Sequence, residues 1–79
     1  MEWKTRYKVL CMLEVLLKLY YQRNISERVL VLKARDIVSH YYSPAIASRV
    51  TEILTRKLGA EMVGDILGEI DEILARAQL

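Results

Sequence analysis

Apolar residues recur at three- and four-residue steps along most of this chain, and this spacing is typical of amphipathic helices. In the first segment they occupy two faces, so we expect that helix to pack against its own domain on one side and against another copy on the other. The periodicity breaks at residues 24–26, at residues 41–43 and at Gly59. We therefore predict one all-α domain over residues 1–79, with four helices at about residues 3–23, 26–41, 44–58 and 60–77.

Residues 29–32 allow two interpretations. Their sequence, Val-Leu-Val-Leu, is a run of four apolar residues, two of them β-branched, which fits either a buried helical turn or a short strand. The helical interpretation is favoured. In the alternative, the second helix begins near Lys33, and the strand resembles the short first strand of a winged helix.

The third helix has the clearest boundaries. Ser43 is a preferred N-cap residue, and Pro44 suits the first helical position, where its missing N–H costs nothing. At the other end, Arg56 and Lys57 are placed favourably at the negative end of the helix dipole. Gly59 then supplies the left-handed residue with which many helices end.

The last predicted helix carries an apolar seam. Its residues alternate three- and four-residue steps, the spacing of a coiled-coil seam, and Gly64 and Gly68 leave a smooth patch on the same helix. Self-association is one interpretation of the two glycines, and close packing inside the chain is the other. The predicted dimer interface consists of Val63, Ile66, Ile70, Ile73 and Ala77.

Composition favours a small assembling protein. The chain has 79 residues and is 53% apolar, which is rich for a chain close to the size where a lone core is marginal. We therefore expect a homodimer, with docking onto a larger protein as the alternative. No apolar run approaches the ~20 residues of a membrane span, and a signal-peptide cleavage site is missing. We expect a cytoplasmic protein without membrane association, and the scarcity of Asn and Gln suits a thermophile.

Charge is unevenly distributed along the chain. The net charge is +2, but residues 1–59 hold eleven basic and five acidic residues, a net of +6. Residues 60–79 hold one basic and five acidic residues, a net of −4. A basic body with an acidic tail helix indicates contact with a polyanion on one side. A solvated acidic helix without a binding role gives the same numbers.

No constellation for catalysis or for metal binding is visible in the sequence. Cys11 is the only cysteine and His40 the only histidine, which leaves no internal disulfide and no zinc site within one chain. A nucleophile with a base and an orienting group, or a glycine-rich phosphate loop, is also missing. We predict that the protein is not an enzyme and holds no cofactor or metal.

Helix 44–58 has a small, polar and basic side, which is what a DNA major groove admits. The sequence ARDIV at residues 34–38, followed by SPAIASRV at residues 43–50, resembles the helix-turn-helix core of prokaryotic, especially archaeal, winged-helix transcription regulators. The likeness is confined to residues 33–58. The turn holds Tyr41 and Tyr42 where that family usually has a glycine, and a predicted helix follows Gly59 where the family has its β-hairpin wing.

This resemblance implies a dimeric regulator that binds double-stranded DNA through helix 44–58. Ile37, Val38, Ile46, Val50 and Leu54 would then be the internal packing set. Arg49 is the candidate for pairing with guanine, while a phosphate contact or an ordinary surface role are its alternatives. The residues expected at the DNA, facing the groove or reaching phosphates, are Lys33, Arg35, Ser43, Ala45, Ser48, Arg49, Glu52, Thr55, Arg56 and Lys57.

A helical interaction module is the competing hypothesis. In that case apolar faces of the first and last helices dock onto a larger partner, and the sequence does not distinguish such a face from a dimer seam. The arrangement of the second and third helices separates the two hypotheses. A helix-turn-helix unit crosses at about 90–120°, whereas an up-and-down bundle keeps neighbouring helices nearly antiparallel.

Overall fold

The computed structural model describes residues 2–60 and 62–77, with side chains from Trp3 onward. Within these residues lie four helices and no strand: α1 (Glu2–Tyr21), α2 (Glu27–Tyr41), α3 (Pro44–Lys57) and α4 (Val63–Ala77). The prediction of an all-α chain of four helices is confirmed. No helix in the described part is long and apolar enough to cross a membrane.

The strand alternative for residues 29–32 is wrong, because these residues lie inside α2. Leu30, Ala34 and Val38 are its fully buried residues, one turn apart, whereas Leu32 is exposed. Burial at every fourth residue is the pattern of a helix with one face in the core, and a strand would bury every second residue instead.

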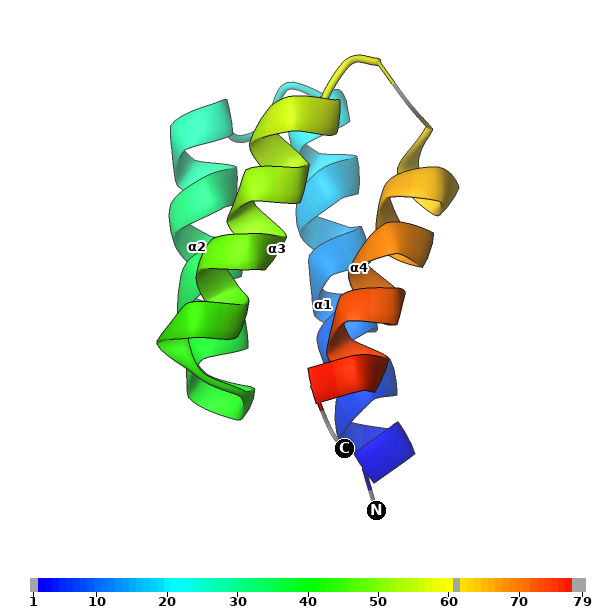
Figure 1. Cartoon of the computed structure of the whole chain (residues 1–79). Helices are drawn as coiled ribbons and strands as arrows, with labels where there is room; N and C mark the ends of the chain where they lie inside the picture. Colours follow the sequence, from blue (N-terminus) through cyan, green and yellow to red (C-terminus); the bar gives the residue numbers. More distant parts are fainter. Residues whose placement is uncertain (1, 61, 78–79) are drawn as a thin grey trace.

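The four helices run alternately up and down (Figure 1). Each helix contacts the two beside it, so that α1 lies between α2 and α4, and α3 completes the square. The two helices of the predicted helix-turn-helix segment, α2 and α3, lie side by side and antiparallel, joined by Tyr42 and Ser43. This is the arrangement of an up-and-down bundle rather than the steep crossing of a DNA-binding helix pair.

All four helices contribute to one hydrophobic core. The fully buried residues of α4 are Ile66, Ile70 and Leu74, which pack into the same core as Leu13 of α1 and Leu54 of α3. The prediction that Ile66 and Ile70 form a dimer interface is therefore wrong. The three-and-four spacing is the same whether a seam faces another chain or the rest of its own bundle, and here it faces its own bundle.

The other members of the predicted seam are partly or fully accessible, and their role in a dimer stays a prediction. Val63 and Ile73 are half-buried and pack against the same core. Ala77 is exposed near the end of α4.

Serine side chains cap two of the helices. The Val29 N–H donates to Ser26 Oγ at the start of α2, and the Ile46 N–H donates to Ser43 Oγ at the start of α3, both at 3.2 Å. Each bond satisfies one of the N–H groups that a helix start leaves without a partner. The predicted cap of α3 is confirmed, including the proline in its first turn.

Helix α1 ends two residues earlier than predicted, in a Schellman motif. Arg23 has a φ of 64°, in the left-handed region where glycine is usual. The N–H groups of Arg23 and Asn24 donate to the carbonyls of Tyr20 and Leu19, at 2.9 and 2.8 Å. The chain therefore turns at an arginine, which the sequence pattern did not indicate.

Helix α4 begins at Val63, later than the predicted residue 60. Gly59, with a φ of 81°, turns the chain as predicted, and Ala60 belongs to that turn. The carbonyl of Met62 accepts the N–H groups of Asp65 and Ile66 at 3.0 and 3.1 Å, which sets the first turn of the helix. Residue 61 lies outside the described residues.

Candidate interaction surface

The predicted DNA-contacting residues are divided between solvent and structural roles. Ser43 is half-buried and caps α3. Lys57 is half-buried, and its Nζ lies 3.8 Å from Glu69 Oε2 of α4. The hydroxyl of Thr55 donates to the carbonyl of Thr51 at 2.9 Å and so turns back onto the helix. The side chains that the structure leaves exposed are Lys33, Arg35, Ala45, Ser48, Arg49, Glu52, Thr55 and Arg56.

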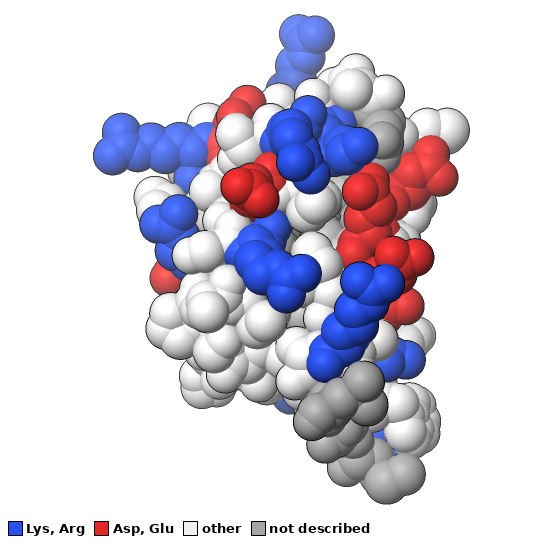
Figure 2. Space-filling model, viewed as in Figure 1, with Lys and Arg blue, Asp and Glu red and all other residues white. Residues whose placement is uncertain are grey.

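Charges of both signs are visible on the side of the molecule formed by α3 and α4. Lys and Arg are spread over α3, while Asp and Glu gather along α4 (Figure 2). Within the α3 set, Glu52 lies among the basic residues. The exposed side of α3 is therefore mixed in charge rather than uniformly basic.

Exposed apolar side chains are concentrated elsewhere, on α1 and on the segment that enters α4. Tyr7 is 66% exposed, Trp3 54% and Tyr21 40%, and Met62 is the most exposed large apolar residue at 77%. Of the exposed large apolar residues of the described chain, Leu32 is the one that belongs to α2. Each of these four residues thus leaves at least 40% of its surface in contact with solvent.

Two surface pockets connect these residues along the groove between α1 and α4. The first, of about 230 Å³, is lined by Trp3, Arg6, Tyr7, Leu10 and Asp71. The second, of about 340 Å³, is lined by Tyr21, Met62, Val63 and Gly64. Because each pocket takes residues from α1 and from the α4 side, both lie along the contact between these helices, one toward each end.

We name this surface the α1–α4 face. Its α1 half carries the large side chains Trp3, Tyr7, Leu10 and Tyr21, and its α4 half includes the residues that line the two pockets and the two glycines. The α4 half is smooth, since a Cβ added at Gly64 or Gly68 would meet nothing within 4 Å. The alternative that these glycines allow close packing inside the chain is therefore wrong.

Polar contacts fasten α1 to the α4 side at both ends of the face. Arg6 Nε lies 3.0 Å from Asp71 Oδ1, an oxygen that is shielded from solvent. Within the described residues this oxygen has no hydrogen-bond partner, so the contact is an ion pair. At the other end, the Gly59 N–H donates to the Tyr21 hydroxyl at 3.2 Å. The large side chains of the face are thus carried on a fixed pair of helices.

Tyr7 shows a perturbed acidity. Its pKa is raised above the ordinary value of 10.0, first because its hydroxyl hydrogen bonds with the Cys11 side chain and then because negative charge on Cys11 and Glu14 opposes a phenolate. Desolvation adds to the same direction. Like any tyrosine at neutral pH, Tyr7 is an uncharged aromatic group with a polar end, a type enriched in protein interfaces.

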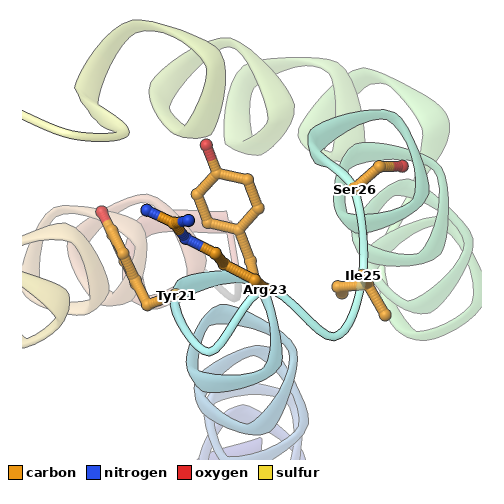
Figure 3. Close-up of a pocket in the computed structure, with 5 residues that line it drawn as sticks. Tyr21, Arg23, Ile25 and Ser26 are labelled. Atoms are coloured by element: carbon orange, nitrogen blue, oxygen red, sulfur yellow. The ribbon is translucent and has the colours of Figure 1, made fainter.

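A third pocket, larger than these two, lies at the connection of α1 to α2 and has a different character. It measures about 510 Å³ and is lined by Tyr20, Tyr21, Arg23, Ile25 and Ser26. Figure 3 shows the Arg23 guanidinium beside the Tyr21 side chain, with Ile25 and Ser26 across the loop. The Ser26 hydroxyl already accepts the Val29 N–H, and each of the lining residues is exposed or half-buried. These side chains do not form an enclosed polar site.

Within the described residues, no group of three or more His, Cys, Asp or Glu side chains is placed to hold a metal ion. No family model matches the sequence, and no match is found among curated proteins or solved structures.

Sequence reasoning identified the apolar stripes of the first helix and the smooth patch of the last one. It missed the exposure of Met62 and the contact between Arg6 and Asp71. The sequence around these three residues carries no local signal of the distant residues beside which they lie.

Proposed function

We propose that this chain is a small helical interaction module that docks onto another protein surface through the α1–α4 face. The observation that carries the proposal is the grouping of Trp3, Tyr7, Tyr21 and Met62 along one groove with two pockets. Single exposed apolar residues are ordinary on protein surfaces and need no explanation. A group of aromatic residues and a methionine beside pockets is the composition of an interface core.

The fold supports this proposal over the regulator hypothesis. A recognition helix enters the major groove because a preceding helix crosses it steeply and holds it away from the body. Here α2 and α3 are antiparallel neighbours, so α3 lies flat in the wall of the bundle (Figure 1). The α1–α4 face needs no such crossing, since two adjacent antiparallel helices present it directly.

Site-specific photo-crosslinking in the cells that make the protein tests the proposal. A photoreactive phenylalanine analogue replaces Tyr7 or Tyr21 in separate variants, and Leu32, an exposed apolar residue of α2, is the matched control position. We expect discrete crosslinked products from positions 7 and 21, lost when Trp3 is changed to Glu in the same chain, and none from position 32. Equal crosslinking at all three positions, or none at 7 and 21, contradicts the proposal.

Binding to nucleic acid is the second candidate function, and one observation favours it. The α3 side chains expected at DNA are exposed, apart from the helix cap and Lys57, and exposed Lys33 and Arg35 lie on the adjacent α2. Because the helix pair lacks the steep crossing, such binding would depend on phosphate contacts, which position a protein on DNA without reading its sequence.

Titration with double-stranded DNA at several salt concentrations tests the second candidate. Arg49→Ala is compared with Arg76→Ala, which removes an exposed arginine from α4 instead. If α3 binds phosphates, affinity falls steeply with added salt, and Arg49→Ala alone weakens binding and lowers the salt slope by about 1. Identical binding by the two variants, or no binding at low salt, rejects this function for α3.

A further inference from the structure

We infer that the occupant of the α1–α4 face is a second copy of this chain, bound so that α1 of each copy lies antiparallel along α4 of the other. The inference rests on the proposed function and names the partner. Three properties of the face lead to it: the sizes of its side chains, the charges of its two helices and its area.

The two halves of the face are complementary in size. The α1 half projects the aromatic side chains Trp3, Tyr7 and Tyr21. The α4 half has Gly64 and Gly68 open to solvent, where a helix or a large side chain can approach closely. A two-fold axis parallel to the helices places the projecting half of each copy on the flat half of the other, which satisfies both halves with one self-complementary contact.

The two-fold axis also preserves the position of each residue along the helices. The first pocket places Trp3 and Tyr7 beside Asp71, in the C-terminal half of α4, and the second places Tyr21 beside Gly64, at its N-terminal end. In the pair of copies, each aromatic group therefore faces the matching end of the second copy's α4. Each of the two pockets is then covered by α1 and α4 of the other copy.

Charge decides between the ways of stacking the helices. Helix α1 holds four basic and two acidic residues, a net of +2, and α4 holds four acidic residues and one basic, a net of −3. Stacking α1 on α1 or α4 on α4 brings like charges together, whereas α1 on α4 brings opposite charges together at both edges of the contact. The exposed residues available for those edges are Lys4 and Lys18 on α1 and Asp65 and Glu72 on α4.

The area of the face is adequate for such a pair. The bundle measures 34 × 21 × 19 Å, so one long side covers on the order of 700 Å². A specific protein–protein contact typically buries about 800 Å² on each partner. One side of this molecule is therefore close to the size that a stable dimer needs.

Sedimentation velocity on the purified chain at micromolar concentration tests the inference. We expect the wild type to sediment as a dimer. Tyr7→Glu and Gly68→Gln should each weaken the dimer roughly tenfold or more, because one buries a charge and the other fills the flat half of the face. Leu32→Glu, the same kind of change on α2, should leave the dimer intact. Gly68→Gln should not unfold the protein, since the site is open and glutamine favours a helix more than glycine does. A weaker dimer in this variant therefore reports on the contact between copies and not on misfolding.

Mixing the two weakened variants identifies the mode of stacking. A pair formed by one Tyr7→Glu copy and one Gly68→Gln copy retains one intact α1–α4 contact, so the mixture should associate more strongly than either variant alone. A monomeric wild type overturns the inference, as does a dimer that survives Gly68→Gln. If the wild type is monomeric while positions 7 and 21 still crosslink to another protein, the dimer is rejected, and the proposed function as an interaction module is retained with a different partner. If both experiments fail, the proposed function fails as well.

Discussion

Replacing Gly68 by alanine should stabilise the fold, although glycine is often assumed to be required where it occurs. Gly68 lies in the interior of α4, and a Cβ there meets nothing within 4 Å. Alanine is more favourable than glycine inside a helix by about 0.8–1.0 kcal/mol, because glycine loses more backbone freedom on folding. With no clash to subtract, Gly68→Ala should raise the free energy of unfolding by about 1 kcal/mol.

Gly59 provides the matched control for this prediction. Its surroundings are equally open, with nothing within 4 Å of an added Cβ, but its φ is +81°. A side chain in the left-handed region costs roughly 1–2 kcal/mol. The same glycine-to-alanine change should therefore lower the free energy of unfolding at position 59, and the difference in sign comes from backbone conformation alone.

Urea denaturation followed by the helical circular dichroism signal measures both effects, at a protein concentration where sedimentation shows monomer. In thermal melts, 1 kcal/mol corresponds to a shift of about 4–8 °C for a domain of this size. The melting temperature should rise for Gly68→Ala and fall for Gly59→Ala. A loss of stability at position 68, or shifts in the same direction at both positions, would refute the reasoning from open space and backbone conformation.

Four further substitutions test other parts of the fold. Ser43→Ala removes the N-cap bond of α3 and should cost about 1 kcal/mol of unfolding free energy in urea denaturation, and an unchanged midpoint would mean that the cap contributes nothing. Arg23→Gly should raise the free energy of unfolding by about 1 kcal/mol, because glycine adopts a φ of 64° without the steric cost that a side chain brings. A decrease would show that Arg23 is not strained in this conformation. Ile70→Ala should cost about 2–5 kcal/mol as a core cavity; a loss of dimer without a loss of stability would place Ile70 in an interface instead. Cys11→Ala should lower the pKa of Tyr7 toward its ordinary value by removing the leading cause of the shift, which NMR titration of the tyrosine ring carbons measures; an unchanged pKa would discount the Cys11 contact.

Local chemistry explains which features the sequence predicted well. Ser43 and Pro44 begin α3 through bonds made within one turn, so their roles follow from residue type and position alone. Gly59 turns the chain for the same reason. The left-handed Arg23 was missed because arginine has no preference for that conformation, and here it is held by the carbonyls of the preceding turn.

Residues that act over long distances in sequence were harder to predict. The seam of α4 was recognised as apolar, but the pattern does not say whether its own bundle or another chain covers it, and the structure buries Ile66 and Ile70 internally. The two apolar faces of α1 posed the same question. The α1–α4 face depends on Tyr7 lying near Asp71, and nothing between these positions in the sequence brings them together.

The order of the helices around the bundle has a consequence for how the chain folds. Three of the four helix–helix contacts in the described chain join helices that are consecutive in sequence: α1 with α2, α2 with α3, and α3 with α4. The fourth joins α1 to α4, the first helix to the last. Relative contact order is therefore low, and helical proteins of that kind fold in microseconds to milliseconds. In stopped-flow refolding, most of the change in helical circular dichroism should occur within the dead time of mixing. Packing of the first helix against the last closes the longest loop, so this step has the greatest loop entropy to overcome.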